Sequence, residues 1–440
     1  MKNKTEAVTD TEPSDNFSSP DYKRSRAVYM AQCTFEYLLS LLVTDAFLTK
    51  LLTHLGLDDT TIGIISSFIS LAFVIQIFAL FLYKLRANAK TTVLWFYPVS
   101  RFIFSSLYII PFLPIGSTTA KVIVMCLILV AYSCKYLVLN VLYKWANSYV
   151  DSHKRASYSA TKEMISLASG IIFTAVVGYV FDEFEASGNI EGGFIMIAIL
   201  AFIISVSDVI CILLIKKEDE IVVKQSNKKF KDIMSNTVGN KNFRSVIVFT
   251  IIYSCATHMI GGFLGTFKVK DLAMSVFIIQ LINIVGNLTR IGVSKPFGRF
   301  SDKHSFASGM TVALCVMLAG YSCIIFTTPK TWWLIAAYAI LHAISIAGLN
   351  QNSFNITYSY VKSDYITEAM AIKSCISGLC GFLASLVGSA ILNYIQRNGN
   401  VIFGIHVYAQ QVLAGISAIL ILISLAIMIF VIGKQKVMKQ

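Results

Sequence analysis

Residues 192–215 have the sequence GGFIMIAILAFIISVSDVICILLI, in which Asp208 is the one charged side chain. A helix needs about 20 mostly apolar residues to cross the hydrocarbon core of a bilayer. Comparable apolar runs recur from Ala27 to Ile432. Hydrophobic residues make up 56% of the 440 positions and charged residues 14%, whereas a soluble domain carries roughly 25% charged residues. We therefore expect an all-α integral membrane protein.

The apolar runs predict twelve transmembrane helices in two six-helix bundles. The predicted helices cover residues 27–54, 60–83, 91–113, 119–143, 157–181, 192–215, 244–267, 273–294, 306–327, 331–356, 366–395 and 404–432. The predicted domains are a disordered tail (1–26), a first bundle (27–215), a linker loop (216–243), a second bundle (244–433) and a short tail (434–440). All nine cysteines fall inside predicted helices without a metal-type CxxC pair, so we expect neither a disulfide nor a metal site.

The basic residues predict the orientation of the chain. With the N-terminus placed in the cytoplasm, 28 Lys and Arg residues fall on the inner side and 6 on the outer side. The positive-inside rule then predicts a multi-pass protein of the cell membrane with both termini and the linker loop in the cytoplasm. The net charge of +13 is spread over many short segments. We therefore attribute it to topology and expect no nucleic-acid partner.

Matching residues in the two halves indicate an internal duplication; the alternative is chance similarity among Ala, Ser and Gly, against which the Lys and Tyr matches count. A shift of 211 residues superimposes similar residues at the inner ends of corresponding helices. The first set is Ser148, Tyr149, Val150 and Ser152 with Ser359, Tyr360, Val361 and Ser363. The second set is Ala160, Lys162, Ser166 and Gly170 with Ala371, Lys373, Ser377 and Gly381. Duplicated bundles are typical of transporters in which two halves rock around a central site.

With six plus six helices and a basic middle loop, the chain resembles the major facilitator superfamily. The segment 296–304, PFGRFSDKH, is similar to that family's short loop signature. This resemblance implies alternating-access transport, with Gly298, Arg299, Asp302 and Lys303 forming a cytoplasmic gate loop. The corresponding first-half segment, 83–90, keeps its basic residues but lacks both Gly and Asp.

Charged residues inside the hydrocarbon are costly and are therefore candidates for function. Glu36 and Lys135 lie at similar depth in predicted helices 27–54 and 119–143, and the resemblance implies that both helices line a cavity. The pair fits either a structural ion pair or a protonation switch. Asp45 lies in the outer half of the first helix, where we expect it to face a vestibule. For Asp208 we expect a partner on another helix rather than solute.

Polar side chains on the predicted second-half helices are further candidates. Gln280, Asn283, Asn287 and Arg290 share one face of helix 273–294, where they suit either a hydroxyl-rich solute or bonding between helices. His258 and His342 are candidate proton relays or simply hydrogen-bonded residues. The weaker candidates are Asn140 and Gln351, which match each other under the 211-residue shift.

The chain lacks the motifs of zinc proteases, of serine hydrolases and of P-loop nucleotide binding. We therefore expect no catalytic residues, no enzyme activity and no cofactor. The leading hypothesis is a monomeric secondary transporter in the bilayer that takes up a sugar, glycoside or related solute, coupled to H+ or Na+. The alternatives are a drug/proton antiporter and, from other classes, a membrane-embedded enzyme or a non-transporting sensor.

Overall fold

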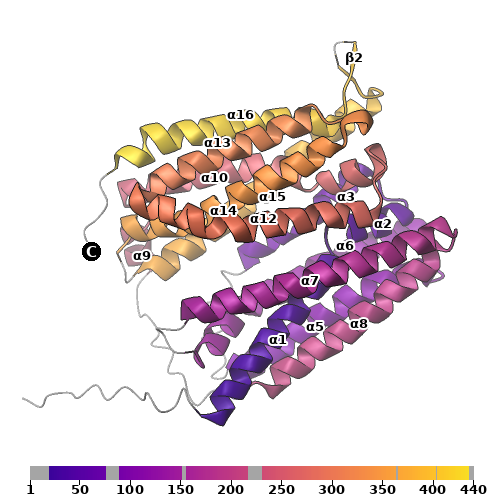
Figure 1. Cartoon of the computed structure of the whole chain (residues 1–440), viewed down its shortest axis with the longest axis horizontal. Coiled ribbons are helices and arrows are strands. Elements are labelled where there is room, and N and C mark those ends of the chain that lie inside the picture. Colours follow the sequence, from indigo (N-terminus) through magenta and orange to yellow (C-terminus); the bar gives the residue numbers. More distant parts are fainter. Residues whose placement is uncertain are drawn as a thin grey trace, which may run out of the picture.

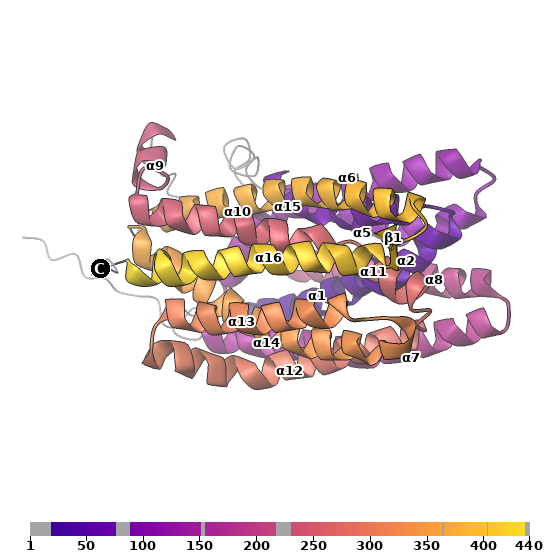
Figure 2. The same cartoon turned by 90° about the horizontal axis from the view of Figure 1, so that it is seen from above.

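The computed structural model describes residues 19–75, 89–150, 155–216, 230–362, 365–402 and 404–435. Its helices run along a common axis in two groups (Figures 1 and 2). In Figure 1 the group built from the first half of the chain lies below, and the group from the second half lies above. The short helix α9 (Phe230–Asn236) lies at the left end of this view.

In the described residues of the first bundle, the helices form six continuous or broken segments. Its elements are α1 (Pro20–Leu42), α2 (Asp45–His54), α3 (Asp59–Ser66), α5 (Ala89–Ser106), η2 (Leu107–Phe112), α6 (Ser117–Asn147), α7 (Arg155–Ala186) and α8 (Ile190–Leu214). The apolar helix that begins with α3 continues to Ile75. Within this bundle α1 packs against α7 and α8, and α5 packs against α6 and α8.

The second bundle repeats this plan with helices of similar length. Its elements are α10 (Lys241–Gly261), α11 (Leu264–Thr266), η4 (Phe267–Asp271), α12 (Val276–Lys303), α13 (Phe306–Ile325), η5 (Pro329–Thr331), α14 (Trp333–Tyr360), α15 (Ile366–Arg397), β1 (Val401–Ile402), β2 (Ile405–His406), α16 (Ala409–Phe430) and η7 (Ile432–Lys434). Here α14 packs against α12 and α13, while α10 packs against α15 and α16.

Ten helices in the described part of the chain are long and apolar enough to cross a membrane. The α1–α2 pair and the helix at 59–75 occupy the places of the first two predicted spans, whereas residues 76–83 lie outside the described residues. The expected all-α membrane architecture is confirmed.

The prediction of one continuous helix over 27–54 is wrong, because the chain breaks between α1 and α2. Thr44 is extended and Asp45 has a positive φ of 47°. A break leaves the last carbonyls of a helix without partners. The hydroxyl of Tyr108 donates to the Leu42 carbonyl, which satisfies one of them. No local pattern in the sequence reveals this tertiary partner.

The predicted gate loop is also wrong as a loop, because Gly298, Arg299, Asp302 and Lys303 lie in the last turns of α12. Phe297 is buried against Gly348 of α14, and Ser301 lies beside Gly309 of α13. This packing keeps the segment helical despite Pro296, and only two residues connect α12 to α13.

The last helix begins at Ala409 rather than at 404, because residues 401–406 form a small antiparallel hairpin. Asn400, Gly399 and Gly404 all have positive φ, which ends the helical path. The hairpin projects beyond the helices at the upper right of Figure 1.

The two bundles approach closely where α3 meets the residues that follow α10. A Cβ on Gly262 would lie 2.6 Å from the Gly63 carbonyl oxygen, and a Cβ on Gly63 would overlap the ring of Phe263. The bundles are also joined by α7 against α12, by α15 against α3, and by α2 against α11, η4 and α12. The glycines thus permit a backbone crossing that larger residues would block.

Candidate functional site

The first bundle holds a pair of opposite charges in its interior. The Lys135 ammonium on α6 lies 2.9 Å from the Glu36 carboxylate on α1. Both side chains are mostly buried, with exposed fractions of 13% and 12%. The contact expected from their similar depth is therefore present. Each charge lowers the cost of burying the other.

Two more charges extend this pair deeper into the bundle. Arg101 on α5 lies 3.7 Å from Glu36 and 3.5 Å from the carboxylate of Asp208 on α8. Gln32 donates to Asp208 at 3.0 Å and to the Tyr97 hydroxyl at 2.7 Å. The Tyr97 hydroxyl donates to Asp208 at 3.1 Å, and its ring lies under the Arg101 guanidinium at 4.2 Å. We call Glu36, Arg101, Lys135 and Asp208 the buried quartet.

The buried quartet carries two cations and two carboxylates, so its formal charges balance. Arg101 and Asp208 are essentially inaccessible, at 1% and 0%, whereas Glu36 and Lys135 keep slight exposure. The sequence predicted that Asp208 has a partner on another helix. It did not identify Arg101 as that partner. The available signal was a lone Arg twelve residues into the apolar helix α5.

A second set of charges joins the two bundles near the α1–α2 break. The Lys268 ammonium on η4 lies 2.6 and 2.8 Å from the carboxylate oxygens of Asp45. Asp59 at the start of α3 pairs with Lys270 and accepts a hydrogen bond from Gln396 at 2.8 Å. Asp45 is therefore engaged by the other bundle, and its side chain is 29% exposed.

Asp182 on α7 adds a third carboxylate to this set. It accepts hydrogen bonds from the backbone N–H groups of Val276 and Phe277, at 3.0 and 2.8 Å, and so caps α12 of the other bundle. A carboxylate at a helix N-terminus is favoured by the helix dipole. We call Asp45, Asp59, Asp182, Lys268 and Lys270 the inter-bundle links. The first bundle supplies the carboxylates, and the second supplies the cations and a helix N-terminus.

The predicted polar face of α12 also points toward the first bundle. Asn283 donates to Asp45 at 2.9 Å and to Gln280 at 3.4 Å. Asn287 lies near the Tyr37 side chain on α1, and Arg290 lies 3.6 Å from Glu163 on α7. The structure thus uses these four side chains at the boundary between the bundles.

The two candidate histidines are not brought together with these charges. The His258 ring lies 2.9 Å from the Ser254 carbonyl of its own helix, and Gly381 of α15 packs against it. The His342 ring packs on Tyr338 at 5.2 Å. Both arrangements suit ordinary helix packing. Asn140 on α6, Gln351 on α14 and Asp302 on α12 have side chains outside the described part of the structure.

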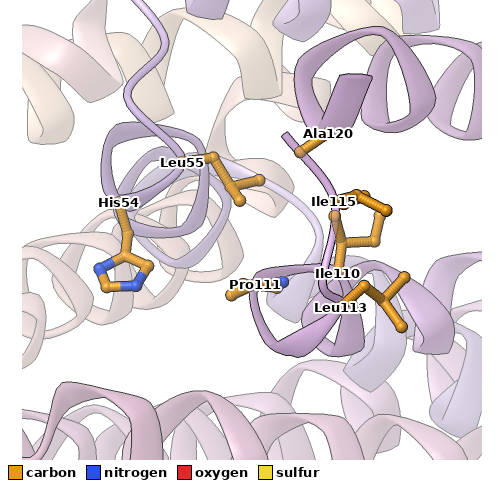
Figure 3. A pocket seen from close by; sticks show the side chains of 7 residues that line it. All are labelled: His54, Leu55, Ile110, Pro111, Leu113, Ile115 and Ala120. Carbon is orange, nitrogen blue, oxygen red and sulfur yellow. The ribbon is translucent and has the colours of Figure 1, made fainter. Parts of the chain in front are cut away.

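A surface pocket of about 230 Å³ lies at the end of the first bundle, between α2, η2 and the start of α6 (Figure 3). Its lining residues include Leu55, Ile110 and Pro111, and His54 is its one titratable side chain. It is separate from the buried quartet. Among the described residues no cluster of three His, Cys, Asp or Glu could hold a metal ion.

Among the comparisons with known proteins, the one with solved structures bears on the fold. No protein-family model matches the chain. No curated protein matches it either. Its structure is similar to a crystal structure of the nucleoside transporter NupG, with a TM-score of 0.72, 14% identity, and coverage of 91% of this chain and 98% of the other.

Two further solved transporters are similar over comparable lengths. A bacterial homologue of ferroportin in an inward-facing state has a TM-score of 0.66 and 11% identity, covering 93% of this chain and 97% of its own. A bacterial homologue of the lysosomal transporter Spinster, inward-facing and unoccupied, has a TM-score of 0.64 and 13% identity, covering 93% and 97%. The chain therefore has the fold of major facilitator superfamily transporters.

Proposed function

We propose that this protein is a secondary transporter that moves a small polar solute, such as a sugar, glycoside or related compound, by alternating access. The transporter fold and the duplicated bundles support the mechanism. The polar boundary formed by Asn283, Asn287 and Arg290 supports a hydroxylated solute, because amides both donate and accept hydrogen bonds. The protein works as a monomer in the cell membrane.

The proposed orientation puts both chain ends and the linker loop in the cytoplasm. The Lys and Arg distribution of the sequence supports this orientation. The inter-bundle links then lie on the outer side. While they are intact, the two bundles are held together there and the transporter is closed to the outside. Tag accessibility in intact cells checks the orientation, and detection of the 216–243 loop from outside would contradict it.

The observation that carries the coupling proposal is the buried quartet. Glu36 and Lys135 keep slight exposure, while Arg101 and Asp208 behind them are sealed. Intramembrane carboxylates with partners of this kind mark proton or ion pathways. We assign the coupling ion, H+ or Na+, to Glu36 at the exposed edge of the quartet.

The experiment is gradient-driven uptake into proteoliposomes. The panel contains labelled sugars, glycosides and nucleosides, with an imposed proton gradient, a sodium gradient or neither. We expect concentrative uptake of one solute class under one of these gradients. Uptake that only equilibrates the solute under every condition would contradict coupling.

The matched control is Lys50→Met. The Lys50–Glu185 pair at 2.6 Å joins α2 to α7 within the first bundle and lies outside the buried quartet. Losing it removes one ion pair while leaving Glu36 and its partners unchanged. Uptake should therefore survive Lys50→Met and fail in Glu36→Gln.

A further inference from the structure

The chain leaves α10 through the segment GGFLG at residues 261–265, which contacts the first bundle. A Cβ on Gly262 would lie 2.6 Å from the Gly63 carbonyl oxygen of α3. One on Gly265 would lie 2.4 Å from the Thr49 hydroxyl of α2. The first of these contacts is with backbone, which cannot move aside as a side chain can, so only glycine fits at position 262. The segment therefore brings the backbone of the second bundle directly against the first.

Phe263 lies within this segment and is fully buried, with an exposed fraction of 0%. One edge of its ring lies over Gly63, where a Cβ would be 1.8 Å from Cε1. The opposite edge lies beside Gly388 of α15, where a Cβ would be 3.2 Å from Cε2. The ring thus fills the space that a side chain at position 63 would take. We call the ring and these two glycines the Phe263 plug.

The Phe263 plug is one part of a longer seam between α15 and the helix that begins with α3. Farther along this seam the rings of Phe68 and Phe382 lie 6.3 Å apart, centre to centre. A Cβ on Gly378 would lie 2.4 Å from the Ser70 carbonyl oxygen. The polar inter-bundle links lie at the other end of the seam, where α3 begins. The seam therefore continues from the links toward the middle of the molecule with close apolar contacts between the bundles.

The contact between Phe263 and Gly63 exists only while the bundles are together. In a transporter whose two halves rock, opening at this end separates α3 from the second bundle. Phe263 then loses Gly63 but keeps Gly388, which belongs to its own bundle. Returning an apolar ring to water costs free energy in proportion to the area exposed. The carboxylates and lysines of the inter-bundle links, by contrast, are solvated by water when they part.

We propose that Phe263, seated at Gly63, is the plug that closes the outer side of this transporter, and that its burial adds to the inter-bundle links in stabilising the outward-closed state. This inference rests on the proposed transport function and orientation, and it assigns a gating residue to that mechanism. A contact made in one of two states stabilises only that state. Replacing Phe263 should therefore shift the equilibrium toward the outward-open state rather than weaken both states equally.

The second bundle offers a matched control, because Phe297 of α12 also packs on a glycine. A Cβ on Gly348 of α14 would lie 2.4 Å from Cε1 of the Phe297 ring. Each glycine contact is lost when its phenylalanine becomes alanine, but the Phe297 contact lies within one bundle. It is therefore kept in every state of a transporter whose bundles move as units. Phe297→Ala should lower the thermal midpoint without changing the balance between the states.

The test measures how fast N-ethylmaleimide reacts with a cysteine in the seam of the purified full chain, after replacement of the native cysteines. Ser70 is fully buried in the seam, so Ser70→Cys reacts when the bundles separate. When opening and closing are fast relative to labelling, the rate follows the population of the open form. We expect the rate to rise at least tenfold in Phe263→Ala and less than twofold in Phe297→Ala. An unchanged rate in Phe263→Ala, or an equal rise in both variants, overturns the plug.

A second pair of variants keeps the test valid if an alanine variant does not fold. Phe263→Leu and Phe297→Leu remove less of each ring, and labelling of Ser70→Cys should rise in the first and not in the second; equal rates overturn the plug. No solute takes part in this measurement, so its result is independent of the uptake assay. Concentrative uptake by the unaltered protein, together with unchanged labelling in Phe263→Ala, would leave the transport proposal intact and overturn this inference.

Discussion

The buried quartet and the inter-bundle links are built from the same residue types but differ in what they join. All four members of the quartet lie in the first bundle, on α1, α5, α6 and α8. The links pair carboxylates of the first bundle with lysines and a helix end of the second. In a molecule whose bundles rock against each other, the quartet moves as one body, whereas the links must break and re-form.

This difference separates stability from conformational equilibrium. Breaking a sealed ion pair leaves an orphan charge in a medium that cannot solvate it. Breaking a link as the bundles separate opens its groups to water, which solvates the freed charges, so the loss is small. The quartet should therefore control folding, and the links should control which state is populated.

The largest effect is expected from Arg101→Leu. The substitution leaves Glu36 and Asp208 with Lys135 as their one remaining cation in the quartet, so an uncompensated carboxylate stays buried. We expect a loss of about 3–5 kcal/mol in the free energy of unfolding, measured as a lower thermal midpoint and less folded protein. Lys50→Met is the control. Equal stability of Arg101→Leu and the unaltered protein would contradict a structural role for Arg101.

The next effect separates the structural and coupling roles of Glu36. Glu36→Gln alone leaves Lys135 unpaired and should lower both folded yield and transport. Glu36→Gln combined with Lys135→Met removes both charges and should restore folded protein. If Glu36 carries the coupling ion, this double variant binds solute but does not concentrate it. Full concentrative transport would remove Glu36 from the mechanism.

A smaller effect is expected when one inter-bundle link is removed. Asp45→Asn weakens the contact with Lys268, which is worth up to about 1 kcal/mol, or roughly fivefold in the ratio of two states. The measurement is the distance distribution between spin labels at Ser187 and Lys330, after replacement of the native cysteines. Separation of the labelled ends should increase in Asp45→Asn and stay unchanged in Lys50→Gln. An unchanged distance distribution in Asp45→Asn would show that the Asp45–Lys268 link does not stabilise the outward-closed state.

The smallest effect concerns the inner end of α12. By family resemblance, Asp302→Asn should lower the rate of transport without changing the amount of folded protein in the membrane. The residue lies in the last turn of a helix rather than in a loop, so a local change should not propagate to the core. Unaltered transport would mean that the resemblance does not extend to this segment.

Much of the helical plan follows from apolar runs, because each membrane span must satisfy its own backbone within one segment. The breaks do not follow, since the contacts found there are tertiary: Tyr108 donates to the Leu42 carbonyl at the α1–α2 break, and Phe297 of α12 packs on Gly348. The Glu36–Lys135 contact could be predicted from the similar depth of the two residues together with the family resemblance, which places both helices at one cavity. Arg101 is a single basic residue in an apolar helix. Its role became apparent only from the positions of Glu36 and Asp208 on two other helices.

The hairpin at 401–406 has a practical consequence. Its strands are two residues long, Ile405 is 66% exposed, and its closing hydrogen bond runs from the Val407 N–H to the Asn400 carbonyl at 2.8 Å. A peptide epitope spliced between β1 and β2 would lengthen a surface turn without entering a helix. An antibody fragment bound to this epitope would serve as a fiducial for electron cryomicroscopy. The protein itself offers little mass outside the bilayer for particle alignment.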